Sequence, residues 1–185
     1  MTRTMPKRRV ALRPQITSDD VDNAAWDLDW PILAMLEKTE DRPKQDVWRG
    51  ESDDTRVYLV HDDGLELRYL VIDGPSADKV VDDVRGELDT VTVEQAEQEF
   101  KDAGSADDRA TATILLGVAS DHGKVSATLK DAASDEARTV RRAAVAALGM
   151  VETAEAKRML EAMASDEDED KVVRNDAKAT LKALG

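Results

Sequence analysis

The chain of 185 residues has a formal net charge of −14, 36% charged residues and no cysteine. The lack of cysteine excludes disulfides, thiolate metal sites and a cysteine nucleophile, and no apolar run approaches the length of a membrane span. The basic N-terminus lacks the apolar stretch of a secretory signal, so a cytoplasmic location is expected.

The charge is unevenly distributed along the chain. Residues 1–14 contain five basic and no acidic residues, residues 15–103 contain nine basic and 25 acidic residues, and residues 104–185 contain 12 and 15. Aspartate dominates, with 26 Asp against 14 Glu. A surface rich in aspartate stays hydrated when salt screens it, which predicts a halophilic protein; an ordinary acidic protein is the alternative.

Residues 1–17 are expected to form a basic flexible arm, and residues 18–74 a small α+β region. Ser18, followed by two aspartates, predicts a helix start. Pro31 suits a first helical turn and predicts that the segment "PILAMLEKT" is a second helix.

A β-hairpin is predicted in "RVYLVHDDGLELRYLVIDG", with Asp63-Gly64 as a two-residue turn. Folding about this turn pairs Val60 with Leu67 and Tyr58 with Tyr69. A lone hairpin is marginally stable, so residues 46–50 are expected to add a third strand that the early helices cover.

Residues 75–104 are expected to form connecting helices. Ser76 predicts the start of the first helix, and Thr92 with Gln95 forms a capping box that predicts the second. Gly104 predicts the end of the second helix.

Residues 105–185 show an internal repeat. "RATATILLG" (109–117) aligns with "RRAAVAALG" (141–149) at an offset of 32, and "VRRAAVAAL" (140–148) aligns with "VRNDAKATL" (173–181) at an offset of 33. Such a period is typical of stacked helical hairpins. Alanines on the apolar faces allow close approach of helix axes at little cost in helix propensity.

The segments "SDEARTVRRAAVAALG" and "ETAEAKRMLEAMASD" resemble the short HEAT repeats named after phycobilisome lyases. The predicted fold is therefore mainly α: a short α-solenoid of HEAT-like hairpins over residues 105–185, preceded by the α+β region with its antiparallel hairpin or three-stranded sheet. The chain departs from the family pattern at Arg158, where a proline is usual, and in an acidic "DEDED" insertion.

The resemblance also implies that the arginine after valine pairs with a loop aspartate of a neighbouring repeat. This role falls on three arginines and three candidate acids: Arg109, Arg141, Arg174, Asp108, Asp135 and Asp166.

No catalytic motif, phosphate-binding loop or zinc motif is present in the sequence, so neither an enzyme nor a cofactor is expected. His61 and His122 are isolated and are expected to be solvated turn residues. The acidic run Asp166–Asp170 imitates a calcium loop, but Lys171 and Ala177 replace its glycine and its final glutamate, so a solvated loop is expected.

Two basic features remain as candidates for partner binding. One is the N-terminal arm, with Arg8 and Arg9. The other is a row on the repeat helices, placed opposite their apolar faces: Arg138, Arg142, Lys178 and Lys182. A solvated helix face is the alternative reading of this row.

These features favour a non-enzymatic scaffold or adaptor that binds a protein partner. A resemblance to small haloarchaeal HEAT-repeat proteins, among them a conditioned-medium-induced one, implies an RNA-processing nuclease, such as a β-CASP enzyme, as the partner. Direct nucleic-acid binding through the arm and the row is one alternative, which the acidic residues 15–103 oppose. A lyase-type enzyme subunit is the other.

Overall fold

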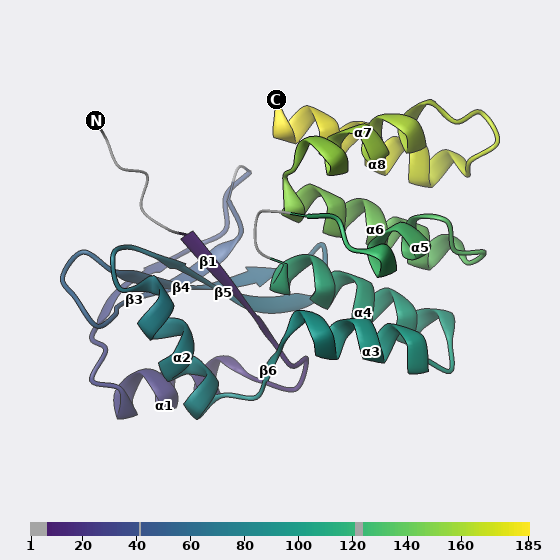
Figure 1. The fold of residues 1–185 in the computed structure, drawn as a ribbon. Coiled ribbons are helices and arrows are strands. Elements are labelled where there is room, and N and C mark those ends of the chain that lie inside the picture. The colour runs from purple at the N-terminus through teal and green to yellow at the C-terminus, as the bar shows by residue number, and fades with distance from the viewer. Residues whose placement is uncertain (1–6, 41, 121–123) are drawn as a thin grey trace. The chain divides into compact units, whose positions relative to one another are not determined.

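A computed structural model of the chain describes residues 7–40, 42–120 and 124–185. The chain divides into two compact units, Met1–Val91 and Thr92–Gly185. The first is a sheet with helices and the second is wholly helical in its regular elements (Figure 1). In the described residues no helix is both long enough and apolar enough to cross a membrane.

The first unit contains one antiparallel sheet of six strands in the order β2-β3-β4-β5-β1-β6. The strands are β1 (Lys7–Leu12), β2 (Ile32–Leu36), β3 (Lys44–Arg49), β4 (Arg56–Asp62), β5 (Leu67–Asp73) and β6 (Thr90–Val91). The sheet therefore contains the predicted hairpin and third strand, and three strands beyond them.

Helices α1 (Ser18–Asp27) and α2 (Ala77–Glu87) pack on one face of this sheet. Thr17, rather than Ser18, caps α1: its side chain accepts the N–H of Asp20, whose carboxylate accepts the N–H of Thr17. The core between helices and sheet is formed by apolar residues of both layers, including Val10, Leu12, Leu59, Leu70, Ile72, Val80 and Val84.

The prediction of a flexible arm over residues 1–17 is wrong for residues 7–12, which form β1 between β5 and β6. Val10 and Leu12 are buried in the core beneath α1 and α2. Three consecutive basic residues made this strand look like a solvated tail in the sequence. In the structure Arg8 forms an ion pair with Asp78 of α2. Residues 1–6 of the predicted arm lie outside the described residues.

The predicted helix after Pro31 is also wrong, because residues 32–36 form the edge strand β2 and pair with β3. The Pro31 carbonyl accepts the N–H of Arg49, which extends this pairing. The hydrophobic pattern of a short apolar run such as "ILAML" is compatible with both a helix and a strand. Pairing with β3 makes it a strand here.

The β4–β5 hairpin differs from the prediction by two residues in register: Val60 pairs with Tyr69, and Tyr58 with Val71. The turn is longer than two residues because the Asp62 carboxylate accepts the N–H groups of Gly64 and Leu65. A shift of two keeps the same side chains on one face. That face is not the helix-covered one, which holds Val57, Leu59, Leu70 and Ile72.

The second unit is a stack of three helical hairpins (Figure 1). The hairpins are α3–α4, α5–α6 and α7–α8, with the bounds α3 (Val93–Asp102), α4 (Ala106–Ala119), α5 (Ala127–Ala133), α6 (Arg138–Val151), α7 (Ala154–Ser165) and α8 (Lys171–Leu184). Helix α4 packs on α6, and α6 packs on α8, so the second helices of the hairpins form one layer.

Helices α2 and α3 were expected to connect the two regions, but each belongs to one unit. Helix α2 lies on the sheet, and α3 packs against α4 as the first half of a hairpin. The repeats therefore begin about a helix earlier than residue 105. The predicted capping box at the start of α3 is present, with Thr92 and Gln95 each accepting the other's backbone N–H.

Two glycines explain how closely the second helices approach. A Cβ on Gly117 of α4 would lie 2.5 Å from the Ala147 Cα of α6, and a Cβ on Gly149 of α6 would lie 2.6 Å from the Thr180 Cγ2 of α8. Both distances are shorter than any unstrained carbon–carbon contact. The Leu-Gly steps at 116–117 and 148–149 are thus the places where the next helix crosses.

Candidate interaction surface

Arginines near the starts of α4 and α6 link successive hairpins through ion pairs, and we call this series of links the ladder. Arg109 binds both carboxylate oxygens of Asp135 in the α5–α6 loop, at 2.8 and 3.0 Å. Arg141 binds the carboxylate of Glu169 in the α7–α8 loop through Nε and Nη2, at 2.8 to 3.0 Å. Each arginine therefore links its own helix to the loop of the next hairpin.

Electrostatics agrees with this geometry. The hydrogen bonds from Arg109 hold the pKa of Asp135 below its ordinary value, and those to Glu169 raise the pKa of Arg141. Both pairs are bidentate and largely shielded by neighbouring helices, which makes them stronger than exposed ion pairs.

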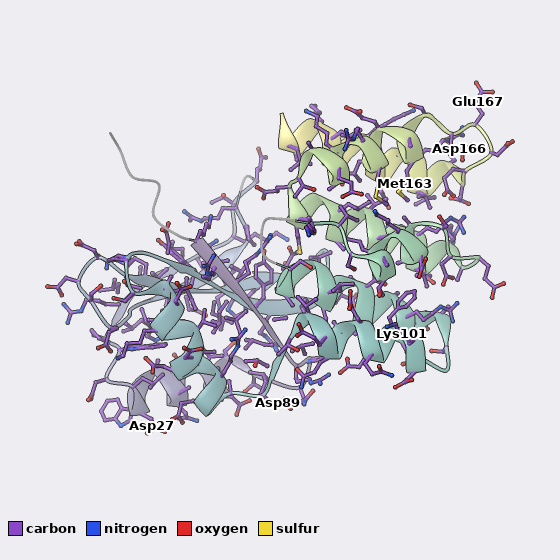
Figure 2. All side chains as sticks on the ribbon, viewed as in Figure 1. Asp27, Asp89, Lys101, Met163, Asp166 and Glu167 are labelled. Carbon is purple, nitrogen blue, oxygen red and sulfur yellow. The ribbon has the colours of Figure 1, made fainter. Side chains whose placement is uncertain are left out.

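The middle arginine of the ladder also holds the loop that precedes it. Arg141 Nη1 donates to the carbonyls of Asp135 and Glu136, at 2.8 and 2.9 Å. Arg174 repeats this half of the pattern, since its Nη1 donates to the carbonyls of Asp166 and Glu167 at 3.4 and 3.3 Å. Figure 2 labels these two acids at the tip of the α7–α8 loop.

Of the acids predicted to pair with the ladder arginines, only Asp135 does so in the described chain. Asp135 pairs with Arg109. Asp108 instead accepts the Ser105 hydroxyl at the start of α4, and Asp166 accepts the N–H of Asp168 within its loop. The partner of Arg141 is Glu169, which the sequence reading placed in the solvated acidic insertion.

The predicted basic row is not one strip. Arg138 lies 3.6 Å from Asp170, and Arg142 binds Asp176 of α8 at 2.7 Å. These two arginines of α6 therefore point towards α8, where they are paired with acids. Both side chains stay about half exposed, at 56% and 50%, but they reach across to the next hairpin and are not free to form one strip with the lysines of α8.

Lys178 and Lys182 lie on the corresponding side of α8, which no further helix of the described chain covers. At the offset of 33, Lys178 stands where α6 has the buried Val145, and Lys182 stands where it has Gly149. Lys171 and Arg174 align with Arg138 and Arg141 and share this side. We call this set the basic face of α8: Lys171, Arg174, Lys178 and Lys182.

The basic face is a continuous stripe, because its members are spaced by three or four residues. The three lysines are exposed and Arg174 is half-buried. In the described part of the chain, no carboxylate forms an ion pair with any of the four. Comparing α8 with α6 at the repeat offset would have revealed Lys171 and Arg174 from sequence.

Other predicted site residues lie elsewhere. Arg8 and Arg9 are in β1, with Arg8 bound to Asp78 and Arg9 in register with Val71. His61 is not in a solvated turn: it lies in β4, and its Nε2 is 2.8 Å from Asp46 Oδ2. His122 falls outside the described residues.

The acidic insertion is a structured loop. Glu169 binds Arg141, and Asp170 caps α8 by accepting the N–H of Val172. This N–H holds the pKa of Asp170 below its ordinary value, with Arg138 adding to the effect. Within the described ranges, no group of three or more His, Asp or Glu residues is arranged to hold a metal ion.

Comparison with known families agrees with this architecture. No curated protein and no solved structure matches the chain at a significant level. Residues 93–182 match the family model of HEAT repeats, and the match begins at α3, as the hairpin stack does. Over residues 93–182 the helical unit is therefore similar to HEAT repeats.

Proposed function

We propose that the protein is a non-enzymatic interaction scaffold whose HEAT repeats bind an acidic protein partner through the basic face of α8. The observation that supports this most is the contrast between α6 and α8. The outward cations of α6 pair with acids of α8 and of the loop before it, whereas the four cations of α8 have no acidic partner within the described residues.

Charge gives this face its selectivity. Four cations on one stripe are unusual in a protein of net charge −14, whose other acidic surfaces repel an acidic partner. Such a partner is therefore steered to α8. Exposed charges of this kind accelerate association and fix orientation more than they add affinity.

The composition supports a salt-adapted cytoplasm as the setting, because aspartate-rich surfaces remain hydrated at high ionic strength. The resemblance to small haloarchaeal HEAT-repeat proteins makes an RNA-processing nuclease of the β-CASP type the first partner to test. We propose a direct contact with the protein rather than with its RNA.

The test is quantitative affinity capture from the native host at native salt, with nuclease-treated lysate. Lys178→Glu with Lys182→Glu should reduce recovery of the partner several-fold and slow its association with the purified protein. A matched control is Lys101→Glu with Arg158→Glu, which makes the same charge change at exposed positions of α3 and α7, outside the basic face of α8. Equal recovery by both double variants would place the interface elsewhere, and loss of the partner on nuclease treatment would make the contact one with RNA.

A further inference from the structure

We propose that Arg174 receives a carboxylate at the start of a partner helix, so that the partner docks on α8 as one more hairpin would. This inference rests on the proposed function, since it concerns the same face. It adds the structural class of the partner: a helix that begins with an acidic residue, rather than a disordered acidic tail or a phosphate backbone.

Arg141 shows which atoms of a ladder arginine bind the next hairpin and which bind its own preceding loop. Arg141 uses Nη1 for the carbonyls of its preceding loop, and Nε with Nη2 for the carboxylate of Glu169. Glu169 immediately precedes Asp170, the residue that caps α8. The incoming carboxylate thus comes from the start of the next second helix.

Arg174 makes only one of the two sets of hydrogen bonds that Arg141 makes, the one to the preceding loop. Its Nη1 donates to the two loop carbonyls, as that of Arg141 does. In the described chain its Nε and Nη2 donate to no side chain, and these are the atoms by which Arg141 holds Glu169. The carbonyls orient the guanidinium before a partner arrives, which lowers the entropic cost of binding.

The remainder of the face indicates how the partner helix continues. An inner helix has Gly at the crossing point, which allows close approach, whereas α8 has Lys182 there. Lys178 replaces a buried valine. An alanine-rich repeat would therefore be held away, whereas a helix with carboxylates opposite these lysines would be bound.

A second copy of this chain does not supply the required group. Asp135 lies six residues before Arg141, and Glu169 lies five residues before Arg174. The positions that correspond to them before Arg109 are Ala103 and Gly104. Head-to-tail stacking would therefore place no carboxylate at either of the two loop positions that the ladder uses, which favours a different protein as the partner.

The experiment uses the full chain and three fluorescent probes at one fixed salt concentration. The first is a stapled helical peptide with carboxylates at the positions that correspond to Glu169, Asp170 and Thr180, which lie opposite Arg141, Arg138 and Gly149, the counterparts of Arg174, Lys171 and Lys182. The second has the same composition with the acids scrambled around the helix, and the third is a single-stranded RNA of similar charge. The first peptide should bind at least tenfold more tightly than the other two.

Arg174→Lys keeps the charge but removes the bidentate geometry. It should weaken the ordered peptide about tenfold, equivalent to about 1.4 kcal/mol, and leave the scrambled peptide unchanged. Replacing the first glutamate of the peptide by glutamine should weaken binding to the wild type but hardly change the affinity for Arg174→Lys, because the contact it would remove is already lost. Arg109→Lys is the matched control and should leave binding unchanged, because it breaks the link to Asp135 in a different loop from the one that orients Arg174.

The outcomes separate the two proposals. Unchanged binding of the ordered peptide to Arg174→Lys, together with weakened binding to Lys178→Glu/Lys182→Glu, would overturn this inference and leave the proposed function standing. Unchanged binding to both variants would overturn the proposed function as well. Tighter binding of the RNA than of the ordered peptide would also refute the inference.

Discussion

Replacing Gly117 by alanine is the most direct test of how the repeats pack. The new Cβ would lie 2.5 Å from the Ala147 Cα and 2.6 Å from its Cβ. The carbon–carbon optimum is about 3.5 to 4.0 Å, so α4 and α6 would have to separate by roughly 1 Å. The obstructing atoms are backbone and a methyl group, and neither can rotate away.

Two effects oppose each other in this substitution. Alanine is favoured over glycine within a helix by about 1 kcal/mol, whereas overpacking a filled interface costs roughly 1 to 3 kcal/mol. Because the backbone itself must move, we expect the upper end of that range and a net loss of about 2 kcal/mol. For a unit of this size, that loss lowers the Tm by roughly 8 to 16 °C.

Gly86→Ala is the matched control, since Gly86 lies within α2 and nothing would lie within 4 Å of its added Cβ. It should stabilise the sheet unit by up to about 1 kcal/mol. Far-UV circular dichroism follows the repeats, and tryptophan fluorescence follows the sheet unit, which contains all three tryptophans. If Gly117→Ala stabilised the repeats as Gly86→Ala stabilises the sheet, the close crossing of α4 and α6 would be refuted.

Two further predictions concern charge. Because Arg109 holds the pKa of Asp135 below its ordinary value, their pair stabilises the fold fully above the unfolded pKa of about 4 and less as the pH falls through the folded value. Arg109→Gln should therefore lower the free energy of unfolding in urea at pH 7 and have a much smaller effect near pH 2; an equal effect at both would exclude the ion pair as the cause. The net charge of −14 predicts that the Tm of the wild type rises from low to molar salt as self-repulsion is screened, and a flat or falling Tm would contradict salt adaptation.

The repeat unit was readable from sequence because its contacts are local and periodic. Within the repeated segment "VRRAAVAAL", Val140, Ala144 and Leu148 recur on one side of the helix and are all fully buried. The resemblance named Arg109 and Asp135 among the ladder residues but did not say which arginine pairs with which acid. One helix alone does not show which of its sides meets the next hairpin, so Arg142 was assigned to a partner-binding row although its guanidinium binds Asp176 of α8.

The sheet unit resisted prediction because long-range pairing overrides local pattern there. Residues 7–12 look like a basic tail until β5 and β6 are known to flank them. Pro31 and the apolar residues after it suit a helix start, and only β3 makes them a strand. The hairpin register depended on the Asp62 side chain, which lengthens the turn in a way that turn propensities do not specify.

The place of β1 in the sheet has a kinetic consequence. This strand, near the N-terminal end of the described chain, is completed by β5 and β6, more than fifty residues later in sequence. Closing such loops is slow, whereas each helical hairpin joins segments that are neighbours along the chain. During synthesis β1 has no partner strand until β5 has emerged, and its second edge stays open until residues 90–91 follow. Charged residues on an unpaired strand disfavour edge-to-edge association, so Lys7, Arg8 and Arg9 are expected to limit aggregation of this segment before it pairs.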